Sequence, residues 1–108
     1  MAYFMLKLNA PRPGFPGDAT EQELAAMAAH SAYWHQLAAQ GAAIAVGPVF
    51  DPAGPFGMAI VDVADDRAAG ELADSDPVIT AGLGFRYDSF PIPSLILRQP
   101  AMAGRDPS

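Results

Sequence analysis

The chain has 108 residues, 51% of them apolar, and its 12 acidic and 6 basic side chains give a net charge of -6. This length supports one hydrophobic core, so we expect a single domain over residues 1–98 and a flexible tail over 99–108. The acidic balance and the scattered basic residues argue against nucleic acids and anionic membrane surfaces as partners. Because there is no cysteine, disulfide bonds and thiolate chemistry are excluded.

The N-terminal segment and the apolar runs bear on the location of the protein. Residues 1–14 lack the basic region, apolar stretch and small-residue cleavage site that are typical of a signal peptide. No apolar run approaches the roughly 20 residues that cross a bilayer. We therefore expect a cytoplasmic protein without a membrane-spanning segment.

The first elements in chain order are a predicted strand and a loop. Residues 2–9 alternate with a period of two, which is typical of a strand. Apolar groups occupy both faces of this strand, with Phe4, Leu6 and Leu8 on one face and Tyr3, Met5 and Lys7 on the other. The next segment, residues 10–18, holds three prolines and two glycines and is expected to be a loop.

A long helix is expected to follow. Thr20 and Glu23 have the spacing of a capping box, in which each side chain accepts a hydrogen bond from the other residue's backbone amide. Gly41 supplies the C-terminal stop. At about 100° per residue, one side of the helix carries Leu24, Met27, Ala28, Ser31, Trp34 and Ala38.

The second half of the chain predicts a hairpin and a short helix. Residues 42–50 indicate a buried strand, 51–57 a turn and 58–63 the returning strand. Asp65 is placed to cap a short helix that ends near Ala73.

The short helix is followed by further predicted strands. Residues 75–77 end it, because the residue before a proline is disfavoured in the helical region, and residues 78–84 predict a short helical turn or an irregular segment. Residues 85–90 alternate as another strand, and residues 94–98 are a candidate fifth strand. The order βαββαβ predicts a ferredoxin-like α+β fold, with both helices on one face of an antiparallel sheet.

This arrangement leaves one face of the sheet uncovered. Tyr3 and Met5, together with apolar residues of the strand 58–63, place apolar side chains there. A second copy, packed sheet against sheet, would bury this face through an isologous contact, so we expect a homodimer through the open sheet face. Residues 94–98 are placed to cap a sheet edge or to reach the partner.

His30 is the first candidate site residue. It lies at the margin of the apolar helix face, one turn before Trp34, where an imidazole can reach both the core and a cleft. The alternative is a structural or surface histidine without a catalytic role. His35 lies roughly 140° around the helix from His30, so the two do not form a metal pair. We expect neither a metal nor an organic cofactor.

A series of residues in a fixed order runs through most of the chain. It comprises His30, Tyr33, Trp34, Leu37, Gly41, Gly47-Pro48, Gly57, Ala68 or Ala69, Leu72 and Asp76-Pro77. In this order the chain resembles the YCII-related family of small bacterial proteins, over about residues 3–93. The resemblance implies a dimeric α/β barrel and an active site built from His30 and Asp76. One branch of the family is similar to enzymes that remove chloride from chlorinated hydroxyquinones.

The chain departs from the commoner family pattern just before the histidine. An arginine often stands there, whereas this chain has Met27 followed by two alanines. If that arginine binds an anionic substrate in the family, this protein is expected to bind a less charged one.

The chemistry expected of His30 and Asp76 is proton transfer. A carboxylate that accepts from one imidazole nitrogen fixes the tautomer and raises the basicity of the other nitrogen. The competing interpretation of Asp76 is a turn residue that caps the amides of residues 78 and 79.

Aromatic residues and the hairpin predict a substrate pocket. We assign Tyr33, Trp34, Gly47 and Pro48 to binding a small-molecule ligand that is flat and apolar. Phe85 and Tyr87 are further candidates for the pocket wall, although aromatic residues at this spacing also serve as core. The hairpin lacks the lysine and hydroxyl of a P-loop, so it does not predict a phosphate site.

Three functions fit these residues. The first is a cofactor-independent lyase or isomerase that acts on a small cyclic or aromatic compound, with His30 as general acid or base and Asp76 orienting it. The second is a cofactor-free oxygenase. The third is a non-catalytic module that binds a metabolite in the dimer cleft.

Overall fold

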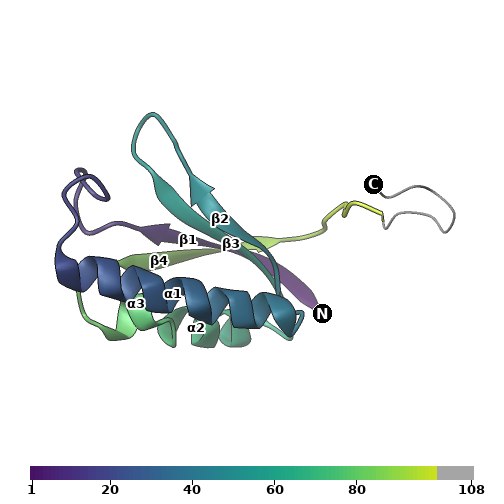
Figure 1. Cartoon of the computed structure of the whole chain (residues 1–108). Helices are drawn as coiled ribbons and strands as arrows, with labels where there is room; N and C mark the ends of the chain where they lie inside the picture. Colours follow the sequence, from purple (N-terminus) through teal and green to yellow (C-terminus); the bar gives the residue numbers. More distant parts are fainter. Residues whose placement is uncertain (100–108) are drawn as a thin grey trace, which may run out of the picture.

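The computed structural model describes residues 1–99. Its elements are β1 (Ala2–Asn9), α1 (Glu21–Ala39), β2 (Ala43–Val49), β3 (Phe56–Val63), α2 (Asp66–Asp74), α3 (Pro77–Thr80) and β4 (Arg86–Ile92). The strands form one antiparallel sheet in the order β2-β3-β1-β4, and the helices lie together on one side of it (Figure 1). The predicted ferredoxin-like α+β fold is confirmed. None of the helices in this range has the length and apolarity that crossing a membrane requires.

The core lies between the sheet and the helices. Phe4, Leu6 and Leu8 are buried on the helix side of β1, as the alternation predicts. Phe4 pairs with Val61 and Leu6 pairs with Ala59 on β3, so the buried layer continues across the two central strands. This burial of apolar area against α1 and α2 stabilises the layered arrangement.

Local signals set the ends of the helices. The Thr20 hydroxyl accepts from the Glu23 amide at 3.1 Å, and the Glu23 carboxylate accepts from the Thr20 amide at 2.9 Å, which confirms the capping box. After α1, Gly41 has a φ of 90°, a left-handed conformation that glycine adopts without strain. Asp65 caps α2 by accepting from the Ala68 amide.

The loop between β1 and α1 is tied to the start of the helix. The Arg12 guanidinium donates two hydrogen bonds to the Glu23 carboxylate, at 2.6 and 2.7 Å, and also contacts Asp18. Phe15, in the same loop, packs edge-on against Phe85 with 5.1 Å between ring centroids. These contacts hold the loop between the start of α1 and the segment that enters β4.

The chain beyond β4 corrects one prediction. A fifth strand at residues 94–98 is wrong, because the described chain contains no strand after Ile92. Figure 1 shows the chain leaving the sheet at this point. Pro91 and Pro93 each lack a backbone donor, and the apolar composition of the segment does not supply a neighbouring strand to pair with. Of the predicted tail, residues 100–108 lie outside the described part of the chain.

The sheet face away from the helices carries an apolar row. Met5 pairs with Ile60 on one side and with Phe90 on the other, so the three side chains lie in line across β3, β1 and β4. The Lys7 ammonium lies 4.7 Å from the centroid of the Phe56 ring on this face. No helix of residues 1–99 lies over this face (Figure 1), where Met5 and Ile60 are half-buried and Phe90 is 45% exposed.

Candidate functional site

Asp76 is a fully buried carboxylate at the start of α3. Its Oδ1 accepts from the Val78 amide at 3.0 Å and caps this short helix. The interpretation of Asp76 as a capping residue is therefore correct for one of its two oxygens. The other oxygen, Oδ2, is directed toward α1, where it is free to take part in a second set of contacts.

Three side chains converge on Asp76 Oδ2. The His30 Nδ1 lies 2.7 Å from it, the Trp34 indole donates at 2.8 Å, and the Tyr87 hydroxyl donates at 2.6 Å. His30 and Trp34 lie one turn apart on α1, and Tyr87 lies on β4. The fold thus brings His30 and Asp76 together across 46 positions of sequence.

The hydrogen bonds determine the charge state of Asp76. Burial by itself raises the pKa of this carboxyl, but the bonds from His30, Tyr87, the Val78 amide and Trp34 outweigh burial and hold the pKa below its ordinary value. Asp76 is therefore ionised at neutral pH. Because an ionised carboxylate only accepts hydrogen bonds, His30 donates from Nδ1, and in the neutral imidazole Nε2 keeps its lone pair.

The two tyrosines near this centre are both held in the protonated form. Burial raises the pKa of the Tyr87 phenol, and its hydrogen bond to Asp76 raises it further, so Tyr87 acts as a lasting donor. Burial also raises the pKa of Tyr33, with a smaller contribution from the charge of Asp76. The Tyr33 hydroxyl donates to the Leu72 carbonyl at 2.6 Å and so links α1 to α2.

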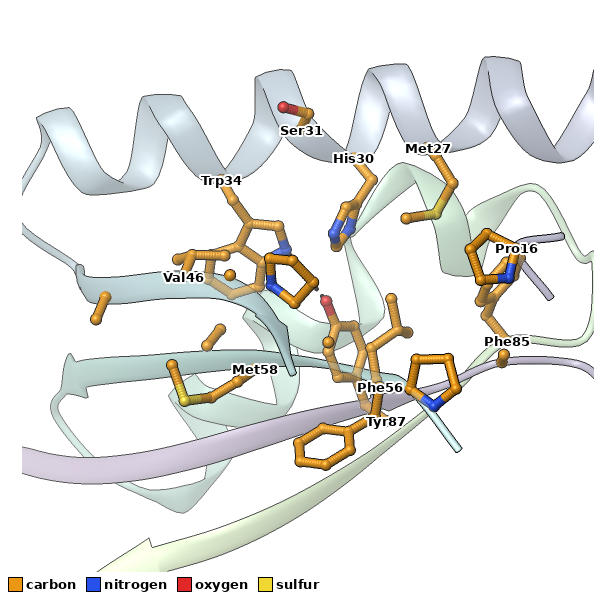
Figure 2. Close-up of a pocket in the computed structure, with 18 of the residues that line it drawn as sticks. Pro16, Met27, His30, Ser31, Trp34, Val46, Phe56, Met58, Phe85 and Tyr87 are labelled. Atoms are coloured by element: carbon orange, nitrogen blue, oxygen red, sulfur yellow. Dashed lines mark hydrogen bonds between the residues drawn. The ribbon is translucent and has the colours of Figure 1, made fainter. Parts of the chain in front are cut away.

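A cavity of about 630 Å³ lies between α1 and the β2–β3 hairpin. This volume falls within the range of roughly 300–1,000 Å³ that is typical of small-molecule sites. Figure 2 shows His30 pointing from the helix into the cavity, with Trp34 beside it. Gly47 and Pro48 also line the cavity, as the sequence predicts, but Tyr33 does not.

The cavity wall is apolar apart from His30 and a few polar atoms. Pro48 pairs with Gly57 across the hairpin, on the helix side of the sheet, and the lining continues around the hairpin to Phe56 and Met58. Further apolar lining comes from Leu8, Phe15, Pro16, Met27, Val46 and Phe85. In the part of the chain that the structure describes, no Lys, Arg, Asp or Glu lines the cavity.

Phe85 and Tyr87, the further candidates for the pocket wall, both line the cavity. The bond of Tyr87 to Asp76 and one end wall of the cavity escape prediction from the sequence. Tyr87 sits two residues after Phe85 in an alternating strand, which indicates a shared face but gives no signal of a bond to Asp76. The end wall made by Phe15 and Pro16 comes from a proline-rich loop, whose composition does not reveal where it folds back. Both contacts depend on the arrangement of distant elements.

Within residues 1–99, no group of three or more His, Cys, Asp or Glu side chains is placed to hold a metal ion. His35 also lines the cavity, at its exposed side, but it makes no described hydrogen bond to His30 or Asp76. His30 and Asp76 together form an imidazole backed by a carboxylate, an arrangement that can transfer a proton.

Comparisons of the sequence with known proteins identify the family of this chain. No curated protein matches the chain. The family model of the YCII-related domain matches residues 1–92, a range that runs from β1 to the end of β4 and includes both His30 and Asp76. Because the match covers most of the sequence, the protein belongs to the YCII-related domain family.

Proposed function

We propose that the protein is a cofactor-independent enzyme of the lyase or isomerase type that acts on a small cyclic or aromatic metabolite. The observation that carries this proposal is the orientation of His30. Its Nδ1 is tied to a buried, ionised Asp76, while its ring points into an apolar cavity large enough for a small molecule. This is the arrangement that a general acid or base requires.

The reaction begins with proton transfer to His30. The Nε2 lone pair takes a proton from a carbon or hydroxyl of the bound molecule, and the electron pair left behind expels a leaving group or shifts a double bond. The imidazolium that forms lies against the Asp76 carboxylate, which stabilises its charge in a site of low polarity. In an isomerisation, Nε2 returns the proton to a different carbon.

We also propose that two copies associate through the open sheet face. The row of Met5, Ile60 and Phe90 is apolar and partly exposed in the single chain, and a second copy would bury it on both protomers at once. The cytoplasmic location and the absence of a nucleic-acid partner stay predictions from composition.

A second candidate function is non-catalytic binding of a small ligand. It is favoured by the scarcity of further acid or base groups in the cavity. Besides His30, the titratable lining residues are His35 and Tyr87, and the Tyr87 hydroxyl is already committed to Asp76. A site of this kind can bind an apolar molecule without transforming it.

Deuterium exchange distinguishes the two candidates. A panel of cyclic ketones and dihydroxybenzenes is incubated with the protein in deuterium oxide, and loss of the acidic C–H signals is followed by proton NMR. We expect catalysed exchange for at least one compound and a decrease of on the order of a hundredfold or more in His30→Gln, because general acid–base catalysis contributes roughly 10² to 10⁴.

The matched control is Gln36→Ala, an exposed position on the same helix that does not line the cavity. It is expected to exchange at the wild-type rate. An equal rate in a folded His30→Gln variant would contradict the role of His30. Binding of several compounds without exchange of any would favour the non-catalytic candidate.

A further inference from the structure

The charge of the cavity restricts what it can bind. Among residues 1–99, no lysine or arginine lines the cavity. The Lys7 ammonium lies over the ring of the lining residue Phe56, on the face of the sheet away from the helices. On the helix side, the Asp76 carboxylate contacts the lining residues His30, Trp34 and Tyr87 from behind. If His30 is neutral, this centre carries one negative charge, and if His30 is protonated, the pair is neutral. In neither state does the site offer a net positive charge to a ligand.

Arg12, Lys7 and Arg86 lie near lining residues of the cavity, but none of these three is itself a lining residue. Arg12 lies in the loop that forms one end of the cavity, but its guanidinium is bound by the Glu23 carboxylate and by Asp18. Lys7 projects from the face of β1 away from the helices, so it lies across the sheet from His30, and its ammonium is over the ring of the lining residue Phe56. A ligand carboxylate or phosphate in the cavity would lose its hydration without gaining a cation in return, which disfavours its binding.

The mouth of the cavity is apolar as well. Four of the exposed large hydrophobic residues within the described chain, Leu24, Ile44, Val46 and Phe50, are among the lining residues, and Phe50 is 82% exposed. Apolar groups left in water at the entrance favour a ligand that buries them. The apolar surface therefore extends from the entrance to His30.

We propose that the site selects neutral, mainly apolar ring compounds that present a single hydroxyl or acidic C–H to His30, and that it rejects analogues bearing an anionic group. The proposal rests on the proposed function in one respect, namely that His30 Nε2 contacts the polar end of the ligand. The apolar walls and the missing cation supply the selection against charge.

The experiment compares two probes of similar shape, para-ethylphenol and para-hydroxyphenylacetate, which differ chiefly in the carboxylate. Binding is followed at neutral pH by the indole N–H signal of Trp34, the only tryptophan of the chain and a lining residue. We expect para-ethylphenol to bind at least tenfold more tightly than the carboxylate probe.

A charge variant tests the cause of this preference. Val46 is 40% exposed and lines the cavity, so Val46→Lys places an ammonium at the mouth with room to reach water. The ratio of the two affinities should shift by about tenfold toward the carboxylate probe, as one favourable ion contact allows. Gln36→Lys adds the same charge on the outer side of α1 and should leave the ratio unchanged.

Several outcomes would overturn the proposal. They are equal or tighter binding of the carboxylate probe to the wild type, an unchanged ratio in a folded Val46→Lys variant, and no binding of either probe at its solubility limit. The outcome for the ligand class is separate from that for catalysis. Neutral probes that bind tightly while no compound exchanges protons would remove the catalytic proposal and leave the ligand class standing.

Discussion

Two buried carboxylates, one within the long helix α1 and one packed against it, differ in the groups that donate hydrogen bonds to them. Glu23, at the start of α1, meets the permanent cation of Arg12 and caps the helix through the Thr20 amide. Asp76, in contrast, is surrounded by neutral donors and by the titratable ring of His30. The first cluster fixes a loop and has no exchangeable group facing a cavity. The cluster around Asp76 ends in the His30 Nε2 nitrogen, which faces the cavity. This difference distinguishes a structural anchor from a candidate site.

The substitution Asp76→Asn should produce the largest effect on the second cluster. The asparagine side chain has two possible orientations. With its oxygen at the Oδ2 position, near the three donors, its NH₂ group faces the N–H of Val78. With the amide rotated by 180°, its NH₂ group faces the three donors instead. Two donors face each other in either case. We expect a loss of about 2 to 3 kcal/mol in the free energy of unfolding, measured with urea, and a decrease in proton exchange on the order of a thousandfold.

The tautomer of His30 separates the catalytic effect of Asp76→Asn from its structural effect. Nitrogen NMR of the imidazole should show the Nδ1–H form in the neutral wild type, because Asp76 accepts from this nitrogen. The asparagine variant should show a mixture of the two forms. His35→Gln serves to assign the signals. Full exchange activity in a folded variant with the altered tautomer would mean that His30 works without the carboxylate.

The acid stability of the protein should show that the first cluster is structural. Hydrogen bonds from Arg12 and from the Thr20 amide lower the pKa of Glu23 from its ordinary 4.5 to about 2. Since the unfolded state then binds the proton more readily, the stability due to Glu23 is complete above about pH 4.5 and is lost as the pH falls through about 2. The shift of Asp76 has the same direction and adds to the loss in acid.

We expect Glu23→Gln to flatten the dependence of unfolding free energy on pH between about 4.5 and 2. At neutral pH, the affinity for para-ethylphenol should change less than twofold, because Glu23 does not line the cavity. Urea unfolding over a pH series and the Trp34 N–H signal measure the two quantities. An unchanged acid slope would contradict the assignment of the acid loss to Glu23. A large loss of affinity would show that the anchor and the site are one cooperative unit.

The two clusters also differ in how far the sequence predicts them. The capping box of Thr20 and Glu23 is a local pattern, and so are the alternation of β1 and the glycine after α1. The Arg12 contact to Glu23 and the Tyr87 contact to Asp76 each span 11 positions without a periodic signal, so the sequence does not predict them. The pairing of His30 with Asp76 comes from the family resemblance, since no local rule relates positions 46 apart.

The wrong prediction of a fifth strand has a related cause. Residues 94–98 have the apolar composition of a strand, but a strand also needs a neighbouring edge, and that depends on the arrangement of the whole sheet. Tyr33 illustrates the same limit for side chains. Its position next to Trp34 indicated the pocket, yet adjacent residues on a helix point about 100° apart, and its hydroxyl reaches Leu72 instead.

Tyr87→Phe should have the smallest effect and tests whether Asp76 is held by the group of donors as a whole. The variant removes one donor from Oδ2 and leaves those of His30 and Trp34, while the ring keeps its edge contact with Trp34 at 6.5 Å between centroids. We expect a loss of about 1 kcal/mol in unfolding free energy. Because one bond that lowers the pKa of Asp76 is gone, the acid loss of stability should begin at a higher pH.

Proton exchange by Tyr87→Phe should decrease less than tenfold, because Asp76 still accepts from His30 and fixes its tautomer. The decrease in proton exchange is to be compared with that of Asp76→Asn. If both variants lost exchange to the same extent while Tyr87→Phe stayed folded and kept the Nδ1–H form of His30, the hydroxyl of Tyr87 would itself take part in moving the proton. A small decrease places Tyr87 among the residues that position the Asp76 carboxylate, with the proton transfer left to His30.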